Sequence, residues 1–251
     1  MRETDFLDGD MRIDAPELAA RGSYKVGVRT VRVVNRNEID ILNRSAEDPY
    51  PTYNRKLKLE VWYPSRLYHN KKELTTYHDV LGSGPDDPER PLRPFKFAGR
   101  AIRGAMPNLA GIQVPSLFIA GKQDQTSGYP NIEWFFENAV NSDRYLLAYE
   151  SAIHEVAVNP APPLAWQRYR EFIHYQEPGW DNRRLNNINQ HFITAFLGKY
   201  IQGDAAQFDP FLDLIEPVSN DSPRDDESDP RYWKGFPNYS AIGMELRHLT
   251  P

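Results

Sequence analysis

The sequence predicts an α/β fold in which an N-terminal antiparallel pair of strands precedes a β-α-β unit. Residues 24–34 and 57–63 alternate apolar and polar side chains, which is typical of strands with one buried face. Residues 114–121 form a continuous apolar run, residues 131–140 repeat apolar side chains at helical spacing, and residues 144–150 form a second apolar run. A strand, a helix and a strand in this order indicate two parallel strands joined by a right-handed crossover.

The two N-terminal segments are expected to pair with each other. Val26 and Val28 give the first segment its alternation and a high β-propensity, and the second segment alternates strictly until Pro64. The intervening residues, 35–56, carry Asn, Asp and Pro and therefore predict a long loop. We expect a half-buried, long-looped antiparallel pair over residues 24–63, at the edge of a sheet.

The remaining segments are less regular. Six prolines interrupt residues 64–108, which predicts a loop and a junction between the two halves of the chain. The apolar run at 114–121 predicts a strand buried on both faces, as in a parallel sheet. Residues 164–175 and 184–201 are predicted to be helices, so that residues 109–202 hold the β-α-β unit and helices. Residues 203–251 are acidic and rich in proline, which predicts a tail.

The composition excludes several classes of protein. The formal net charge of −5 differs from the basic footprint of a nucleic-acid-binding protein. No run of 18 apolar residues and no signal peptide is visible, which predicts a soluble, cytoplasmic protein. The chain has no Cys, which excludes disulfides, thiolate metal sites and a Cys nucleophile. With 21 prolines, the composition favours one domain with long loops over residues 1–251.

Two residues that could carry chemistry follow the strands of the β-α-β unit. Asp124 comes just after the segment 114–121, and His154 comes just after 144–150. Catalytic groups of open α/β sheets lie at the carboxyl ends of the strands, and neighbouring strands are about 5 Å apart. An Asp and a His on adjacent loops can therefore form the acid and base of a nucleophile-His-acid triad. In the alternative interpretation, Asp124 only caps a turn and His154 is a loop histidine.

Several segments of the chain occur in a recognisable order. They are residues 24–30, 60–64, 95–101, 114–121 with Asp124, and 149–154, followed more weakly by 232–236 and 241–246. In this order they resemble α/β-hydrolases of the dienelactone-hydrolase and platelet-activating-factor-acetylhydrolase-like branch. The resemblance covers most of residues 20–202 and, more weakly, 230–248. It implies a carboxylic-ester hydrolase of the esterase or lipase-like class, with Asp124 as the acid and His154 as the base.

The chain departs from this family at its centre. The family implies a nucleophilic Ser in Gly-x-Ser-x-Gly on a turn between a strand and a helix, and this chain contains no such motif. The segment 99–107 is followed almost directly by 109–115, so the central strands that would carry the nucleophile are missing near Asn108. We therefore expect an abbreviated α/β-hydrolase-like sheet with an incomplete triad, which is weak or inactive alone.

No other residue replaces the missing nucleophile on sequence grounds. Ser83 lies between two glycines in a flexible turn, and Ser116 lies within a predicted strand. Ser127 and Ser151 are near the Asp-His pair in sequence, but neither follows a strand-to-helix turn pattern. The remaining candidates are better explained as packed or surface histidines and as a solvated acidic run; they are His174, His191 and residues 225–229. No metal or cofactor is predicted.

The missing strands also predict an interaction surface. Without central strands, the pair at 24–34 and 57–63 and the strand at 114–121 lose a neighbour, and exposed edges invite pairing with another chain. The partners we expect are a small ester substrate, if the chain is active, and a second copy that pairs through the sheet edges, with no nucleic acid and no membrane span. Two alternatives remain: a non-catalytic interaction or scaffold protein, and the product of a gene that has lost its central part.

Overall fold

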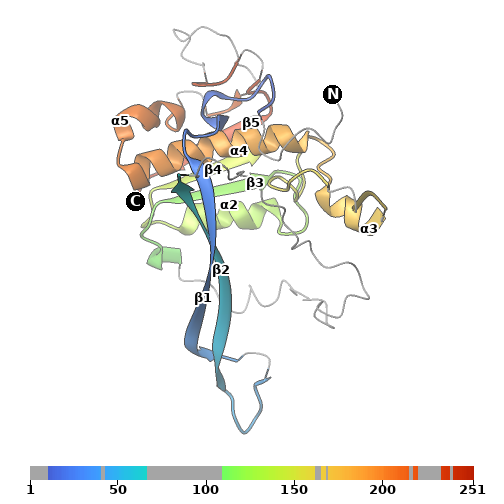
Figure 1. Ribbon diagram of the computed structural model, residues 1–251, viewed down its shortest axis with the longest axis vertical. Coiled ribbons are helices and arrows are strands. Elements are labelled where there is room, and N and C mark those ends of the chain that lie inside the picture. The colour runs from blue at the N-terminus through green and yellow to red at the C-terminus, as the bar shows by residue number, and fades with distance from the viewer. Residues whose placement is uncertain are drawn as a thin grey trace. The chain divides into compact units, whose positions relative to one another are not determined.

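The computed structural model describes residues 11–40, 43–66, 109–161, 165–167, 169–214, 217–219, 233–237 and 240–251. Where the sequence predicts one domain over residues 1–251, contacts divide the chain into two compact units. One is Arg21–Ser83, and the other joins Met1–Ala20 to Gly84–Pro251. Each unit is described by itself below (Figure 1). Nearly all of the predicted loop and junction at 64–108, with Ser83 and Asn108, lies outside the described residues, as does the acidic run 225–229.

The smaller unit is a two-stranded antiparallel ribbon, as the alternation predicts. Strand β1 (Lys25–Ile39) pairs with β2 (Thr52–Ser65), with Val31 opposite Leu59 and an irregularity in register between Asn35 and Glu38. Both strands are longer than predicted, so most of the expected loop at 35–56 is wrong and only about a dozen residues connect them. The two strands stay hydrogen-bonded to each other through polar residues such as those at 35–39 and 52–56. This pairing, and not a buried face, stabilises each strand.

The prediction that this pair is half-buried is wrong for the described residues. Most side chains along β1 and β2 are exposed, and only a few of them are of intermediate exposure. The reason is that the described part of this unit has no further strand or α-helix that could pack as a second layer, so neither face gains within the unit the cover that the alternation anticipates.

The larger unit contains the predicted β-α-β arrangement. Strand β3 (Ser116–Gly121) is followed by helix α2 (Tyr129–Asn138) and then by β4 (Arg144–Tyr149), which runs parallel to β3. A further strand, β5 (Met244–Leu249), pairs with the other edge of β4 in the antiparallel sense, so the order is β3-β4-β5 (Figure 1).

Burial within this sheet differs from the prediction. Every residue of β4 is buried, whereas Ser116 to Ile119 of β3 are only partly buried, and Val114 before them is 67% exposed. Among the described strands, β4 has a neighbour on each side and β3 has one. Leu117 and Ile119 of β3 pack against one apolar cluster and Phe118 against the other, so the prediction of a strand buried on both faces is confirmed in part for β3 and fully describes β4.

The prediction of a tail over residues 203–251 is also wrong in part. Strand β5 lies within it, and so do the short helix α5 (Ala205–Phe208) and a 3-10 turn at Asp209–Phe211. Met244 and Leu246 are buried while the residues between and after them are less so, which is the alternation of a strand with one buried face. This alternation spans only six residues, and the acidic, proline-rich composition around it led to the prediction of a tail.

The two predicted helices have different outcomes. Helix α4 (Asn182–Leu197), followed by a π-helical turn at Gly198–Gln202, confirms the prediction at 184–201. The side chain of Asp181 caps the helix by accepting a hydrogen bond from the Arg184 amide at 2.9 Å. A continuous helix over 164–175 is wrong. The residues that the structure describes there form the short α3 (Tyr169–Phe172) and two 3-10 turns, Ala165–Gln167 and Ile173–Tyr175.

The reason for the broken helix is a lack of packing. Trp166 is 60% exposed and Tyr169 is 78% exposed, so the large apolar side chains of this segment find little surface to cover. Helices in proteins draw most of their stability from packing an apolar face. The apolar spacing of residues 164–175 therefore does not produce one helix.

The sheet separates two apolar clusters. Tyr145, Leu147 and Tyr149 of β4 belong to the larger cluster, together with the buried residues of α4, and Leu146 packs with Phe136 of α2 in the smaller one. Alternate residues of a strand point to opposite faces, so α4 covers one face of β4 and α2 the other. This packing fixes the carboxyl ends of β3 and β4, where both predicted site residues follow. No described helix is long and apolar enough to cross a membrane.

Candidate functional site

The structure brings the two predicted site residues into contact. Asp124 lies three residues after the end of β3, and His154 lies five residues after the end of β4. The Oδ2 atom of Asp124 is 2.9 Å from Nδ1 of His154. The two side chains therefore meet at the carboxyl edge of the parallel pair, where the strand order predicts them.

The carboxylate of Asp124 is fixed by its own turn. Its Oδ1 atom accepts hydrogen bonds from the amides of Thr126 at 2.7 Å and Ser127 at 3.0 Å. Burial favours a higher pKa for Asp124, but the hydrogen bonds from His154 and from these two amides outweigh it and hold the pKa below its usual value. Asp124 thus caps a turn and contacts His154 at the same time, so capping the turn is not its only contact.

The imidazole of His154 is oriented by this contact. An ionised carboxylate only accepts hydrogen bonds, so Nδ1 of His154 carries the proton that lies between the two residues. In the neutral ring this leaves the lone pair on Nε2. The His154 side chain is 44% exposed and that of Asp124 only 7%, so the imidazole faces solvent while the carboxylate is shielded from it. This arrangement can accept a proton at Nε2.

Main-chain contacts hold the two loops together. The amide of Lys122 donates to the carbonyl of Tyr149 at 2.9 Å, and the amide of Gln123 donates to the carbonyl of Ala152 at 2.8 Å. Gly121 lets the loops approach, because a Cβ at this position would lie 2.1 Å from the carbonyl oxygen of Ile153. The glycine at the end of β3 is therefore required for the observed separation of Asp124 and His154.

The considered serines do not complete a triad. Ser116 lies at the opposite end of β3, where its hydroxyl donates to the carbonyl of Val114 at 3.1 Å. Ser127 contributes its amide to Asp124, and Ser151 has a positive φ of 57° within the loop that leads to His154. In the described part of the chain, no serine hydroxyl forms a hydrogen bond with the ring of His154.

The same edge of the sheet carries an ion-pair group that the sequence analysis missed. Lys122 contacts Glu150 at 2.5 Å and Glu245 at 2.7 Å, which joins the ends of β3 and β4 to the start of β5. Burial favours a lower pKa for Lys122, but the two carboxylates outweigh it and raise the pKa to about 12. The lysine therefore stays charged beside the candidate site and fixes the strand ends. Glu245 could not be connected to it while residues 203–251 were interpreted as a tail.

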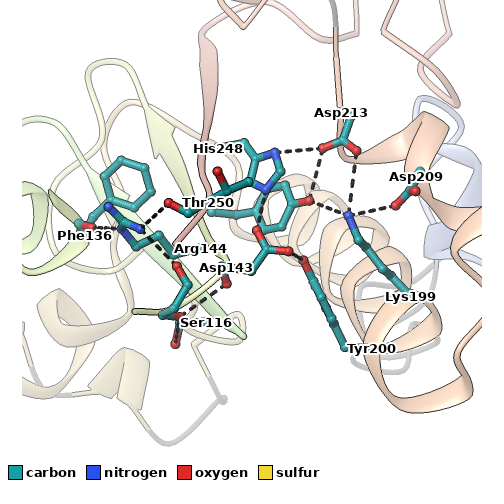
Figure 2. Close-up of polar contacts among 12 residues, drawn as sticks. Ser116, Phe136, Asp143, Arg144, Lys199, Tyr200, Asp209, Asp213, His248 and Thr250 are labelled. Carbon is teal, nitrogen blue, oxygen red and sulfur yellow. Dashed lines mark hydrogen bonds and ion pairs between the residues drawn. The ribbon is translucent and has the colours of Figure 1, made fainter. Parts of the chain in front are cut away.

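A second polar cluster lies at the other end of β4 (Figure 2). The ring of His248 stacks on Tyr145 with centroids 4.1 Å apart, and its nitrogens lie 2.6 Å from Asp143 and 3.0 Å from Asp213. Lys199 approaches the Tyr145 hydroxyl at 2.9 Å. Further contacts connect Lys199 to Asp209 and Tyr200 to Asp143.

The polar groups of this cluster bind one another and connect β4 and β5 to the end of α4. Asp143 and His248 of this cluster are more than 100 positions apart in the chain, so no spacing pattern in the sequence indicates the cluster. Because both ring nitrogens of His248 face carboxylates, the cluster has the arrangement of a structural ion-pair network and not of an open reaction site. Among the residues that the structure describes, no group of His, Asp or Glu could hold a metal ion.

His191 and His174 are located as the sequence suggests. His191 is fully buried among aromatic rings, its Nδ1 accepts the Leu18 amide at 3.1 Å, and burial lowers its pKa to about 3. His174 is exposed in the 3-10 turn Ile173–Tyr175. The first is a packed histidine and the second a surface histidine, as predicted.

Comparison with known proteins adds no relative. No protein-family model matches the chain, and a search of curated proteins finds none that is similar to it. The class of protein and its activity are therefore argued below from the residues and the geometry of this chain.

Proposed function

We propose that the chain is an abbreviated α/β-hydrolase-like protein of the carboxylic-ester hydrolase class, esterase or lipase-like. It retains the acid Asp124 and the base His154 of a Ser-His-Asp triad but has no Gly-x-Ser-x-Gly nucleophile. The 2.9 Å contact between Asp124 Oδ2 and His154 Nδ1, with Oδ1 held by two amides, is the observation that supports this proposal.

The pair acts as a general base toward water in this proposal. Nε2 of His154 takes a proton from a water molecule as its oxygen attacks the ester carbonyl, and Asp124 stabilises the imidazolium that forms. The bond from the acyl carbon to the alcohol oxygen then breaks, and the imidazolium returns its proton to the departing alkoxide, which leaves the acid and the alcohol as products. General base catalysis contributes about 10²- to 10⁴-fold. A serine nucleophile and aligned oxyanion donors supply most of the rest in a complete site. We therefore expect weak activity from the chain alone.

Hydrolysis of p-nitrophenyl acetate and butyrate tests the proposal. We expect slow hydrolysis by the wild type that falls to background in His154→Ala and is unchanged in His174→Ala, because His174 is an exposed histidine away from Asp124. Equal rates for all three proteins would refute the role of His154 as a base. Rapid wild-type turnover that is lost in His154→Ala would instead refute the claim that the triad is incomplete.

The exposed ribbon favours a second function, interaction with another copy of the chain. The ribbon of β1 and β2 presents a set of exposed large apolar side chains, which are Val26, Val28, Val33, Val34, Ile39, Tyr53, Leu59, Val61, Trp62 and Tyr63. Exposed apolar side chains gathered on one element are typical of a surface that binds another protein chain. We propose that two ribbons pair in a homo-oligomer.

Sedimentation velocity at increasing protein concentration tests this second function. We expect dimers in the wild type and in Ile201→Lys, which changes an exposed apolar residue outside the ribbon, but monomers in Leu59→Lys/Val61→Lys. The two strands carry seven basic and two acidic residues, so added salt should strengthen pairing by screening like charges. A wild type that stays monomeric at every concentration would refute ribbon pairing, and dimers weakened by salt would indicate that the ribbon contacts an acidic surface.

A further inference from the structure

The loop that carries His154 has a second support besides β3. The carboxylate of Glu177 is buried, with 5% of the residue exposed. Its Oε2 atom accepts the amide of Ile153 at 2.8 Å, and its Oε1 atom accepts the amide of Gly179 at 3.2 Å. Glu177 therefore binds the main chain directly before His154, from the side of the chain that precedes α4.

Residues next to Glu177 contact the same loop. The indole Nε1 of Trp180 donates to the carbonyl of Glu150 at 2.7 Å. A Cβ on Gly179 would lie 2.3 Å from the carbonyl oxygen of Ser151, so only glycine allows this approach. Ser151 itself has a φ of 57°, in the left-handed region that is unfavourable for a residue with a side chain. The loop is thus held in a strained form by contacts along residues 177–180.

The environment of Glu177 is costly for a carboxylate. Burial raises its pKa, as does the charge of Glu155, and the hydrogen bonds from Ile153 and Gly179 only partly offset this. Within the described residues no Lys, Arg or His forms an ion pair with Glu177. A buried carboxylate without a cation is costly unless hydrogen bonds compensate it, and one of the two hydrogen bonds that do so here comes from the loop of His154.

We propose that Glu177 is a positioning residue that acts through the amide of Ile153 and sets the orientation of the His154 ring toward Asp124. The importance of this orientation for proton transfer rests on the proposed function of His154 as a base. The effect of Glu177 on the His154 ring does not rest on that function. In this proposal, Glu177 influences which nitrogen of His154 is protonated whether or not the chain hydrolyses an ester.

Nitrogen-15 NMR of the histidine rings tests this proposal in the full chain. The signals of His154 are assigned by their loss in His154→Ala. In the wild type we expect the His154 ring to show the form protonated at Nδ1. In Glu177→Ala we expect signals averaged over the two ring tautomers, as for an exposed histidine such as His174. The exchange of the Ile153 amide should accelerate about tenfold or more, the effect of losing one hydrogen bond to a charged acceptor. Glu155→Gln is the matched control, because it removes a neighbouring charge but leaves both amide contacts intact.

The outcomes separate positioning from general stability. Glu177→Ala with unchanged His154 signals would overturn the proposal, and so would an equal change in Glu155→Gln. If Glu177→Ala does not fold, Glu177→Gln decides, because it keeps the size of the side chain and one oxygen acceptor. A shift of the His154 ring signals with the buried indole signal of Trp233 unchanged supports positioning, and shifts in both or in neither overturn it. Ester turnover is not a readout here, so absence of activity would refute the proposed function without affecting this result.

Discussion

Replacing Gly121 with Ala should separate His154 from Asp124. The added methyl carbon would lie 2.1 Å from the carbonyl oxygen of Ile153 and 2.5 Å from that of Ala152. Real Cβ atoms essentially never come within 3.0 Å of such atoms, so the loop must retreat by about 0.9 Å or more. Both obstructing atoms belong to the main chain and cannot rotate away, which makes the retreat a movement of the whole loop.

The size of this movement is enough to break the contact. Along the line from His154 Nδ1 to Asp124 Oδ2, a shift of this size lengthens 2.9 Å to about 3.8 Å, beyond a hydrogen bond. Overpacking of this kind costs about 1 to 3 kcal/mol, which corresponds to a fall in melting temperature of about 2 to 12 °C for a domain of this size. We therefore expect Gly121→Ala to melt at a lower temperature and to lose the Nδ1-protonated form of His154.

Thermal melting and nitrogen-15 NMR of the histidine rings measure these two effects. Gly22→Ala is the control, because a Cβ on Gly22 meets nothing within 4 Å. The reasoning would be refuted by a Gly121→Ala protein that keeps the wild-type His154 signals and melts together with the control.

Two further predictions concern stability and pH. Burial holds the pKa of His191 at about 3 in the folded chain, below its unfolded value of 6.5, so stability should fall by about 1.4 kcal/mol per pH unit as the pH drops from about 6.5 toward 3. Urea unfolding across this range should show a shallower slope in His191→Gln, which keeps an acceptor for the Leu18 amide; an identical slope would contradict the assignment. Hydrogen bonds from Tyr200 and His248 outweigh burial and lower the pKa of Asp143 in the folded chain below its unfolded value of 3.8. The ionised Asp143 therefore stabilises the folded chain above pH 3.8, and this stabilisation is lost as the pH falls through the pKa of the folded state. Asp143→Asn should therefore be less stable than the wild type at pH 7 and should approach it at pH 2 to 3, and a constant difference would refute this.

Local patterns in the sequence predict part of the structure well. The strands β1, β2, β3 and β4 and the helices α2 and α4 follow from apolar periodicity over short windows. The contact between Asp124 and His154 follows from one further rule, that parallel strands bring their carboxyl ends to the same edge. These features are predictable because each depends on neighbours in sequence or on adjacent strands.

The features that sequence analysis missed depend on distant pairing. Strand β5 joins β4 from about a hundred residues further along the chain, and its six-residue alternation is too short to outweigh the composition around it. His248 meets Asp143, and Lys122 gains Glu245 as its second carboxylate, only once β5 is in place. Glu177 contacts Ile153 from 24 residues further along the chain, and no periodicity in the sequence marks this separation.

The late position of β5 affects how the chain is made. On the ribosome, β4 emerges with one edge able to pair with β3, while its other edge waits for roughly a hundred further residues. At synthesis rates of about 5 to 20 residues per second, this interval is on the order of 5 to 20 s. During that time the nascent chain exposes an apolar strand, so molecular chaperones that recognise such strands should associate with it before translation ends.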